Sequence, residues 1–495
     1  MNSLIRRFLL LIILAIYLAL AAGYALLTPL WQAPDEPAHF NNIAFIAQKG
    51  RLPVLQAGDY DQAYLEKLKT ERFPSQLSIE PVRYERHQPP LYYLLMAPAL
   101  TALRGAGLSV QVRALRLLNI LIGVLTLWFI WLAARRFFAG RSRAALLATG
   151  FAAFLPMHIA MTSSINNDAL AELLITAVMF RLLGALHSRA VTPAQWALTG
   201  LLVGLGFLAK FQAYILILLA GAVWLWRMRQ DMRAQRLTAS AWIGGAALTL
   251  PALLLGLPWW LRNLRVYGFP DFFGLDRHNA VVVGQPRTAD WITSQGWSAY
   301  LDRFVTFTFR SFWGVFGWMG VFMDARIYLV LTLLSLLILT GLLWLLYHRR
   351  RDIALSAFQK QALGLLLLHL ALVITAYLWY NLDFVQHQGR YLFPALLPIS
   401  IFAAAGLLAV FSSAGSRWGA GAALLFLGYW LTSGLVTGYL DKWALLLSAA
   451  VAGLLFVRAF LLPRVDAFWW GLTAEGMMAI IALYALFGAI IPQLG

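Results

Sequence analysis

Long runs of apolar residues recur along the whole chain and are separated by short polar segments. Many of these runs are about 18 to 22 residues long, which is the length that crosses a hydrocarbon core of about 30 Å as an α-helix. The first run, Phe8 to Leu30, follows Arg6 and Arg7 and lacks a small-residue cleavage site, so we expect a retained span rather than a signal peptide. The pattern predicts an all-α integral membrane protein.

Composition supports the membrane assignment and argues against nucleic-acid binding, disulfides and thiolate metal sites. Of 495 residues, 61% are hydrophobic and 12% are charged, whereas soluble domains are about 45–50% apolar and about 25% charged. A formal net charge of +18 would suggest nucleic acid in a soluble protein. Here the basic residues lie in short loops, a pattern typical of cytoplasmic loops, so we expect no nucleic-acid partner. The chain has no cysteine, which excludes disulfides and thiolate metal sites.

Three basic clusters decide the predicted topology: Arg135 to Arg143, Arg227 to Arg236 and Arg349 to Arg351. If every apolar segment crossed the membrane, about fourteen crossings would result and the first two clusters would lie outside. One net crossing between Pro89 and Ala134, with Pro89 to Leu103 re-entrant or at the interface, returns all three to the cytoplasm. The sequence therefore predicts about 13 transmembrane helices, with the N-terminus in the cytoplasm and the C-terminus outside.

This topology gathers the polar segments on the extracytoplasmic face of a plasma (inner) membrane. Two long outer loops, 31–88 and 262–310, carry twelve of the 21 acidic residues, and long loops are where function concentrates. The short segments 163–168 and 383–390 and the residue Lys210 fall on the same face.

Two segments of the first outer loop, Pro37 to Gln48 and Tyr60 to Arg72, have partly apolar faces and predict amphipathic helices on the membrane surface. No internal repeat is evident. We expect an N-terminal functional module over 1–327 and a C-terminal helical module over 328–495, without a linker between them.

Asp35 and Glu36 stand side by side at the start of the first outer loop. Acidic residues at the end of a span suggest a functional site. Asp35 also fits the N-cap of a helix that begins at Glu36-Pro37. The two interpretations are compatible, because a cap fixes the backbone while a carboxylate at a partly desolvated interface accepts a proton from an attacking hydroxyl or amine.

Polar residues next to other apolar runs extend the candidate site. His87 and Gln88 precede the paired prolines Pro89-Pro90; a helix start explains the prolines but not His87 or the nearby Glu85. We expect the polar side chains at the start of this apolar run to bind a phosphate or to orient an acceptor. Asp168 lies in a turn between two spans, where it also fits a helix cap.

Three cations stand at the edges of apolar runs on the same face: Lys210, Arg262 and Arg390. Each also fits a side chain that snorkels to the interface. The arginines lie in aromatic segments with Tyr267 and Tyr391, their planar forks suit phosphate oxygens, and glycine before Arg390 would let a ligand approach the backbone. Three cations opposite a carboxylate pair favour an anionic lipid headgroup as ligand.

Together these segments resemble the GT-C superfamily of membrane glycosyltransferases, in the branch of protein O-mannosyltransferases and the lipid A aminoarabinose transferase. The resemblance covers roughly the N-terminal 400 residues and rests on the order of Asp35-Glu36, Pro89-Pro90-Leu91, Asn167-Asp168, Lys210 and the segments PWWLRN…YGFP and GRYLFP. It implies a GT-C-like multi-span helical bundle with amphipathic surface helices. Related sequences often carry His or Lys directly before the paired prolines, whereas here Gln88 takes that position and His87 precedes it.

The resemblance also implies an inverting transfer of a sugar from a polyprenyl-phosphate-linked donor, with Asp35 as base. The acceptor would be a lipid, a protein or a glycan. Lys210, Arg262 and Arg390 would stabilise the charge on the departing phosphate. Glu36 or Asp168 would orient the acceptor or hold a metal. Because the sequence lacks His or Cys ligand spacing, we expect no metal and no cofactor, although three carboxylates leave a divalent metal open.

Two other functions compete with glycosyl transfer. A transporter or flippase of a lipid-linked anion also needs cations within the membrane. The sequence lacks an inverted repeat, and its polar groups gather at one face rather than at mid-membrane. A non-catalytic scaffold would leave the acidic pair and the three cations without a role.

Overall fold

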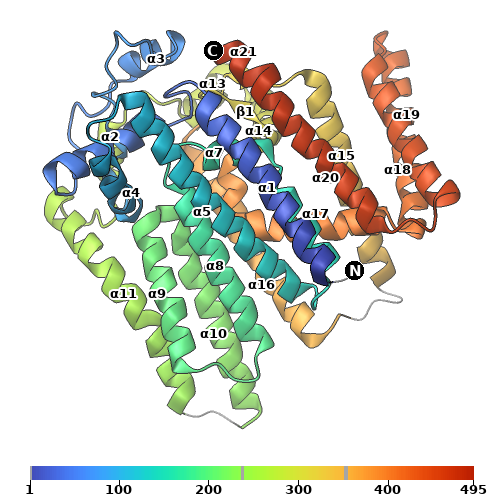
Figure 1. Ribbon diagram of the computed structural model, residues 1–495, viewed down its shortest axis with the longest axis horizontal. Helices are drawn as coiled ribbons and strands as arrows, with labels where there is room; N and C mark the ends of the chain where they lie inside the picture. The colour runs from blue at the N-terminus through green and yellow to red at the C-terminus, as the bar shows by residue number, and fades with distance from the viewer. Residues whose placement is uncertain (1–2, 236–238, 350–354) are drawn as a thin grey trace.

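The computed structural model describes residues 3–235, 239–349 and 355–495. Arg236 of the second basic cluster and Arg350-Arg351 of the third lie outside the described residues. The described structure is almost entirely helical, as expected (Figure 1). Long apolar helices pack side by side, and shorter polar elements gather at one end of the bundle.

Eleven helices among the described residues are long and apolar enough to cross a membrane. They are built from α1 (Ser3–Leu27), α5 (Leu108–Phe137), α8 (Asp168–His187), η2 (Phe211–Tyr214) with α10 (Ile215–Arg233), α11 (Ala239–Tyr267), α15 (Ala325–Arg349), α16 (Ala357–Asp383), η3 (Gly389–Ala395) with α17 (Leu396–Val410), α18 (Ser413–Thr437), α19 (Lys442–Phe456) with η4 (Val457–Leu461), and α20 (Ala467–Tyr484) with η5 (Ala485–Ile490) and α21 (Ile491–Leu494).

Two further candidates bear on the expected number of spans. Helices α6 (Ser142–Ala153) and α7 (Pro156–Thr162) meet at a bend of 67° and make a twelfth span if they are counted together. Helix α9 (Pro193–Ala209) is shorter, because its 17 residues extend about 26 Å. The prediction of about 13 crossings is therefore not confirmed among the described residues; it is reached only if α9 is also counted.

Contacts at the helix ends give the bundle a direction. Arg6, near the start of α1, donates a hydrogen bond to the Ser142 hydroxyl over 3.0 Å, and Arg143 pairs with Asp466 before α20. Helices α1 and α20 therefore start at the same end. Both run toward the end where the C-terminus lies beside the first long loop (Figure 1). The start of α1 and the end of α21 thus lie at opposite ends of the bundle.

The first long loop folds into the two predicted helices, α2 (Glu36–Lys49) and α3 (Gln62–Thr70), followed by the 3-10 turn η1 (Tyr84–His87). Helix α3 buries only Leu65 and Leu68. Helix α2 is buried over most of its length and packs on α4 (Leu91–Ala102). The 12 residues of α4 extend about 18 Å, too short to cross a core of about 30 Å. The second long loop contains α12 (Leu275–Val281), α13 (Thr288–Gln295), α14 (Trp297–Trp313) and the antiparallel pair β1 (Val315–Phe316) and β2 (Val321–Phe322).

Two apolar cores hold these parts together. The larger core joins α1, α5, α6 and α8 to α17 and α20, so helices from both predicted modules share it. The smaller core lies under the first long loop, where α2 and α4 pack against the start of α5. The division near residue 328 stays a prediction.

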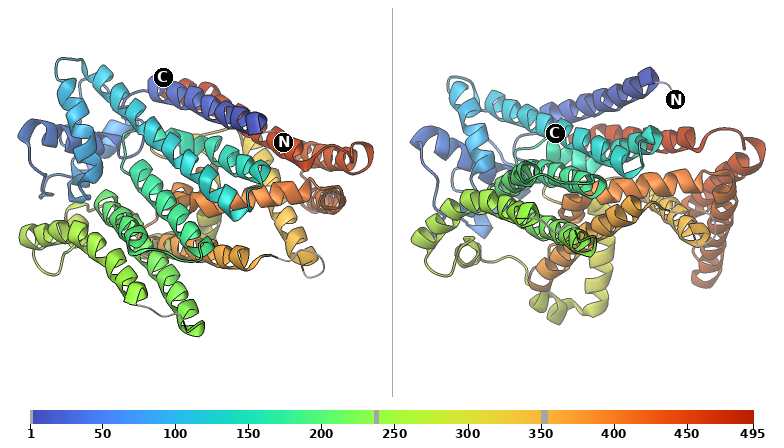
Figure 2. Two further views of the ribbon diagram at one scale, coloured as in Figure 1. Left: turned by 60° about the horizontal axis from the view of Figure 1, so that its bottom comes forward. Right: turned by 90° about the horizontal axis from the view of Figure 1, so that it is seen from below.

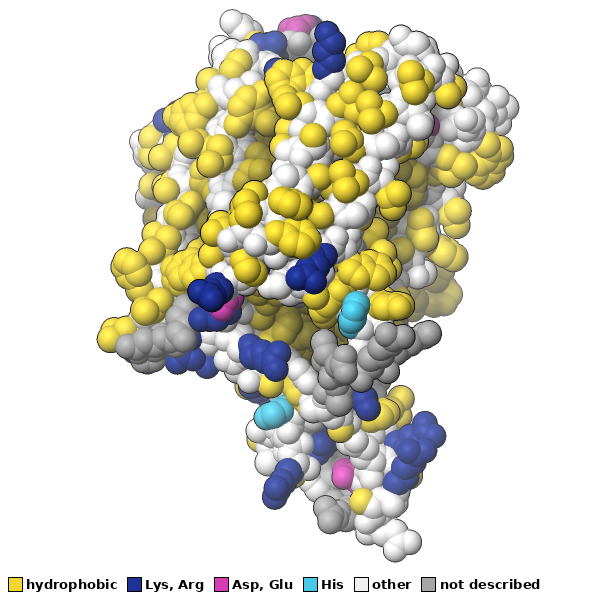
Figure 3. All heavy atoms as spheres, turned by 90° about the vertical axis from the view of Figure 1, so that its right-hand side faces the viewer, with side chains coloured by type: hydrophobic (Ala, Val, Ile, Leu, Met, Phe, Trp, Pro, Cys, Tyr) yellow, Lys and Arg dark blue, Asp and Glu magenta, His cyan; other side chains and the backbone are white. Residues whose placement is uncertain are grey.

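Helices α18 and α19 form a hairpin at one edge of the bundle (Figure 2). Leu425, Leu435 and Val436 on α18 are among the most exposed large apolar side chains. Seen from that side, hydrophobic side chains cover most of the upper part of the molecule, and Lys and Arg side chains gather below them (Figure 3). An apolar belt with a basic edge is the surface expected where a helical bundle meets lipid.

Candidate active site

Asp35 is the first residue of the site, and its backbone is unusual. It stands at the N-cap position of α2 with a φ of 66°, in the left-handed region, but its side chain makes no capping hydrogen bond among the described residues. Left-handed residues other than glycine are uncommon, and such strain clusters at functional sites. One carboxylate oxygen of Asp35 accepts a hydrogen bond from the Tyr84 hydroxyl at 2.7 Å, and the other accepts one from Arg390 at 3.0 Å. The carboxylate is therefore directed at the site rather than at the helix end.

Glu36 faces a different partner. Its carboxylate accepts two hydrogen bonds from the Arg116 guanidinium, at 2.7 and 2.6 Å, and one each from the backbone N–H groups of Trp31 and Ile165. Arg116 also donates to the carbonyl oxygen of Ala25 in the last turn of α1 and to those of Thr28 and Pro29 just after the helix. These contacts support a structural role for Glu36, which anchors the backbone beside Asp35.

A second ion pair lies near Asp35. The ammonium of Lys210, directly after α9, donates to the carboxylate of Asp168, the first residue of α8, over 2.7 Å. The adjoining Asn167 side chain donates to the side chain of Gln88 and to the carbonyl of Ala209, both over 3.2 Å. Lys210 is therefore held by a carboxylate inside the protein and does not simply snorkel to the interface.

His39 belongs to the same network, although the sequence reasoning did not select it. It lies one helical turn after Asp35 on α2, and its Nδ1 is 2.8 Å from the Tyr93 hydroxyl. The charges of Lys210, Asp35, Asp168 and Arg390 all act on the ring. Burial, assisted by the Lys210 ammonium, lowers the pKa of His39 to about 4, so the ring is neutral at pH 7. The spacing of four residues from Asp35 was the available signal, because it places both residues on one helix face.

The carboxyl groups of Asp35 and Glu85 titrate differently. Burial alone would raise the pKa of Asp35, but the Arg390 guanidinium, His39 and the Tyr84 hydroxyl hold it below its ordinary value. Asp35 is therefore ionised at neutral pH. In η1, burial and the charge of Asp35 raise the pKa of Glu85 to about 7. The Oε2 atom of Glu85 is buried without a hydrogen-bond partner among the described residues.

A cavity of about 60 Å³ lies beside the Lys210 ammonium. His87, Gln88 and Lys210 supply its polar side chains. The ring of His87 also packs against that of His278, with centroids 4.4 Å apart. The remaining wall is mainly aromatic and apolar, made by Pro89, Phe211, Tyr214, Trp259, Phe273 and Leu275. The cavity thus combines a cation and hydrogen-bonding groups with an apolar lining.

Arg262 and Tyr267 lie next to this cavity but do not line it. The Arg262 guanidinium donates to the Pro53 carbonyl and lies over the rings of Trp259 and Tyr267, 4.9 and 5.5 Å from their centroids. The Tyr267 hydroxyl accepts the backbone N–H of Leu55 at 3.2 Å. Both residues join the second long loop to the first, and Arg262 reaches the cavity only through Trp259.

Arg390 is held in place at the start of η3. Its Nε donates to the side chain of Gln388 over 2.7 Å, and its guanidinium lies 5.3 Å from the ring centroid of Tyr391. The expectation that a ligand approaches Gly389 was wrong. A Cβ there would lie 2.3 Å from the backbone of α14, at Thr308 and Phe312, so the glycine allows close packing of a helix.

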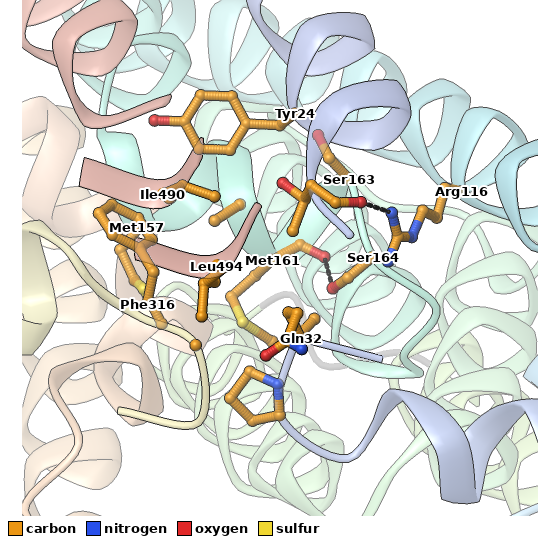
Figure 4. A pocket seen from close by; sticks show the side chains of 15 residues that line it. Tyr24, Gln32, Arg116, Met157, Met161, Ser163, Ser164, Phe316, Ile490 and Leu494 are labelled. Carbon is orange, nitrogen blue, oxygen red and sulfur yellow. Dashed lines mark hydrogen bonds between the residues drawn. The ribbon is translucent and has the colours of Figure 1, made fainter. Parts of the chain in front are cut away.

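A second cavity, of about 30 Å³, lies against the segment that leads to Asp35 (Figure 4). Gln32, Ala33 and Pro34 line it together with α7 and the C-terminal residues Ile490 and Leu494. Among its polar groups, the Ser164 hydroxyl donates to the Met161 carbonyl over 2.9 Å, as Figure 4 shows. The two cavities share no lining residue. Within the described residues, no group of three or more His, Asp or Glu side chains is arranged to hold a metal ion.

Comparison with known sequences points to one family. Residues 87–259 match the family described as dolichyl-phosphate-mannose-protein mannosyltransferase. This segment is about a third of the chain, and it contains His87, Gln88, Asp168 and Lys210. No curated protein sequence matches the chain.

Solved structures give the broader likeness. ArnT from Cupriavidus metallidurans bound to undecaprenyl phosphate is 17% identical with a TM-score of 0.52, and the match covers 99% of this chain and 77% of that one. An oligosaccharyltransferase from Archaeoglobus fulgidus is 14% identical with a TM-score of 0.50, and this chain covers 57% of it. At such identities the likeness establishes the fold. The expected resemblance is confirmed: this chain is an integral membrane protein with the fold of the GT-C glycosyltransferases, to which both ArnT and the archaeal oligosaccharyltransferase belong.

Proposed function

We propose that this protein is a glycosyltransferase that moves a sugar from a polyprenyl-phosphate-linked donor to an acceptor at the outer face of the membrane, with inversion at the anomeric carbon. The observation that carries the proposal is the Asp35–Arg390 pair beside the Asp168–Lys210 pair. A partly buried base and two cations in one network are the groups that an acceptor proton and a leaving phosphate require.

The cavity at Lys210 is the proposed site of the donor phosphate. Lys210 uses one of its three ammonium hydrogens on Asp168, which leaves two for phosphate oxygens. His87 and Gln88 add polar contacts, and the aromatic wall suits the first isoprene units. The structure of ArnT with undecaprenyl phosphate, which shares the fold, supports a lipid phosphate as ligand.

In the proposed reaction Asp35 takes the proton of the acceptor hydroxyl or amine. The acceptor atom bonds to the anomeric carbon as the bond from that carbon to the phosphate oxygen breaks. Lys210 and Arg390 receive the charge that develops on the departing phosphate, so the leaving group needs no proton. General-base assistance of this kind accelerates a reaction by about 10²- to 10⁴-fold.

We assign supporting roles to the other predicted residues. His87, Gln88 and Asp168 would position the donor, while Arg262 and Tyr267 would hold the loop that borders its cavity. Tyr391 lies under the Arg390 guanidinium and meets Tyr380 edge to face at 5.8 Å, so we assign it to the wall near the sugar. Glu36 would keep the Asp35 backbone in place through Arg116.

The function is tested with purified protein in lipid vesicles, supplied with polyprenyl-phosphate-linked sugars and with membrane lipids, glycans or peptides as acceptors. We expect free polyprenyl phosphate and a glycosylated acceptor to appear in equal amounts. Passage of the intact donor across the bilayer without any transfer would instead identify a transporter or flippase. If the protein binds the donor but does not cleave it with any of these acceptors, the proposed reaction is wrong.

A further inference from the structure

Glu85 lies in the chain between a residue that binds the proposed base and two residues that line the proposed phosphate cavity. In η1 it directly follows Tyr84, whose hydroxyl binds Asp35, and it precedes His87 and Gln88, which line the cavity at Lys210. Its Oε2 atom is buried and has no partner within the described ranges. No step of the proposed reaction uses this carboxyl group.

The charges of the site are balanced without Glu85. Asp35 neutralises Arg390, and Asp168 neutralises Lys210. The titratable groups that act on Glu85 come from several elements around it: Asp35 at the start of α2, Tyr84 in η1, Tyr93 on α4, Asp168 on α8, Lys210 after α9 and Tyr380 on α16. Helix α12 also packs on η1, with the ring of His278 against that of His87. An ionised Glu85 is thus an extra negative charge in a buried region, next to a cavity that is to receive an anion.

Two buried like charges at close range do not both remain ionised. A phosphate placed beside Lys210 adds at least one negative charge, and Asp35 and Asp168 keep theirs through their cations. Glu85 is the carboxyl group in this region without a cation of its own. We propose that Glu85 takes up a proton when a phosphate binds in the cavity at Lys210, and that the neutral carboxyl group then forms part of the phosphate site. This inference rests on the proposed function, which supplies the phosphate.

The resting state of Glu85 suits this role. Because burial and Asp35 bring the pKa of its carboxyl group to about 7, the group is about half protonated at neutral pH before the ligand arrives. His39 and His87 have lowered pKa values, mainly through burial, and stay neutral there. A bound phosphate raises the pKa of Glu85 further. The affinity for the phosphate is therefore highest below pH 7, and it decreases as the pH rises from 7 toward the raised pKa. Over that interval the affinity falls by up to about tenfold per pH unit.

The test uses undecaprenyl phosphate and the full chain in detergent. Titration calorimetry at pH 7.5, in buffers of different ionisation enthalpy, counts the protons taken up per lipid bound. We expect the wild-type protein to take up protons when the lipid binds, and Glu85→Gln to lower this uptake by about half a proton or more. The lipid affinity of Glu85→Gln should also change less between pH 6.5 and 8.5 than that of the wild type. The same measurement on Glu85→Gln subtracts the titration of the lipid phosphate itself. Glu80→Gln is the matched control, because Glu80 lies in the same segment with an exposed side chain.

The possible outcomes distinguish a failure of the Glu85 proposal from a failure of the proposed function. If wild-type protein does not bind undecaprenyl phosphate, the proposed donor site fails. If it binds with the same proton count as a folded Glu85→Gln variant, the donor site stands and the role of Glu85 is wrong. Should that variant not fold, infrared difference spectra of the wild type decide. Binding is expected to add the absorption of one protonated carboxyl group, and an unchanged carboxyl region would reject the proposal.

Discussion

Glu36 and Arg116 form a doubly hydrogen-bonded ion pair in which the two side chains are 0% and 1% exposed. Arg116 lies in the N-terminal part of α5, and Glu36 is the first residue of α2. The pair therefore ties the first long loop to the ends of α1 and α5. Asp35 is the residue next to this anchor.

Breaking this pair is expected to destabilise the protein strongly. Arg116→Met leaves the Glu36 carboxylate buried without a cation, which costs about 3–5 kcal/mol in comparable pairs. The change is measured as a lower unfolding temperature of the purified protein in detergent. Arg326→Met is the matched control, since Arg326 forms an exposed pair with Asp324 and should change the unfolding temperature little. Equal effects of the two variants would contradict the anchoring role.

Asp35→Asn is expected to abolish sugar transfer, because the amide no longer accepts the acceptor proton. Asparagine keeps the size of the side chain and tolerates the left-handed backbone, but it leaves the buried Arg390 without its carboxylate, so we expect a folded variant with a lower unfolding temperature. Turnover of purified protein is the measurement. Asp61→Asn serves as the control, since Asp61 caps α3 in the same loop. Near-normal turnover in Asp35→Asn would remove the base assignment.

The cations of the site should differ in their effect on donor affinity. Arg390→Ala, and Lys210→Met combined with Asp168→Asn, are each expected to weaken undecaprenyl phosphate binding about 10- to 100-fold. That range corresponds to the loss of about 1.5–3 kcal/mol for a hydrogen bond to a charged group. The double variant leaves no uncompensated carboxylate. Arg262→Ala should have a smaller effect, because Arg262 lies beyond Trp259. The three affinities are compared by calorimetry, and an equal loss in all three would place Arg262 in the phosphate site.

The sidedness of the site is testable by single cysteines, since the chain has none. Ala57→Cys in the first long loop is exposed, and we expect it to react with an impermeant thiol reagent in intact cells. The neighbouring Gly58 is less suitable, because its φ of 87° strains other residues. Ala190→Cys, between α8 and α9, should react only after lysis. The reverse labelling pattern would overturn the predicted orientation.

Acid should destabilise the fold through His39. The unfolded ring has a pKa near 6.5, whereas the buried ring has a pKa of about 4, so between these values the unfolded state binds more protons. The stabilising contribution is complete above pH 6.5 and is lost as pH falls to about 4. Its full size is on the order of 3 kcal/mol, at about 1.4 kcal/mol per pKa unit. Unfolding temperatures measured across this range should fall less steeply for His39→Gln than for the wild type.

The helical membrane architecture and the position of the site segments were predictable from the chain alone. Apolar runs predict the membrane spans, and basic loop residues predict where those spans end. Both patterns arise because polar and charged groups are costly within lipid. The α2 and α3 helices were predicted from their apolar faces. The exact number of spans was not, since α9 is shorter than the usual crossing length and α6 bends into α7.

The partners within the site were not predictable. Arg390 and Asp35 are 355 positions apart, and nothing local indicates that they pair. Three cations were expected to bind a phosphate, yet two of them, Lys210 and Arg390, are each bound to a carboxylate. A buried cation needs such a partner. Arg116 was overlooked because it lies within a long apolar helix, where its role depends on Glu36, 80 positions away.

The left-handed backbone at Asp35 limits which substitutions can report on chemistry. Only aspartate, asparagine and glycine adopt this conformation readily, and other residues lose about 1–2 kcal/mol there. In a library of all amino acids at position 35, a loss of activity in the alanine and glutamate variants could therefore come either from misfolding or from the loss of the base. Asparagine and glycine are the informative replacements, because they change the carboxylate and spare the turn that presents it.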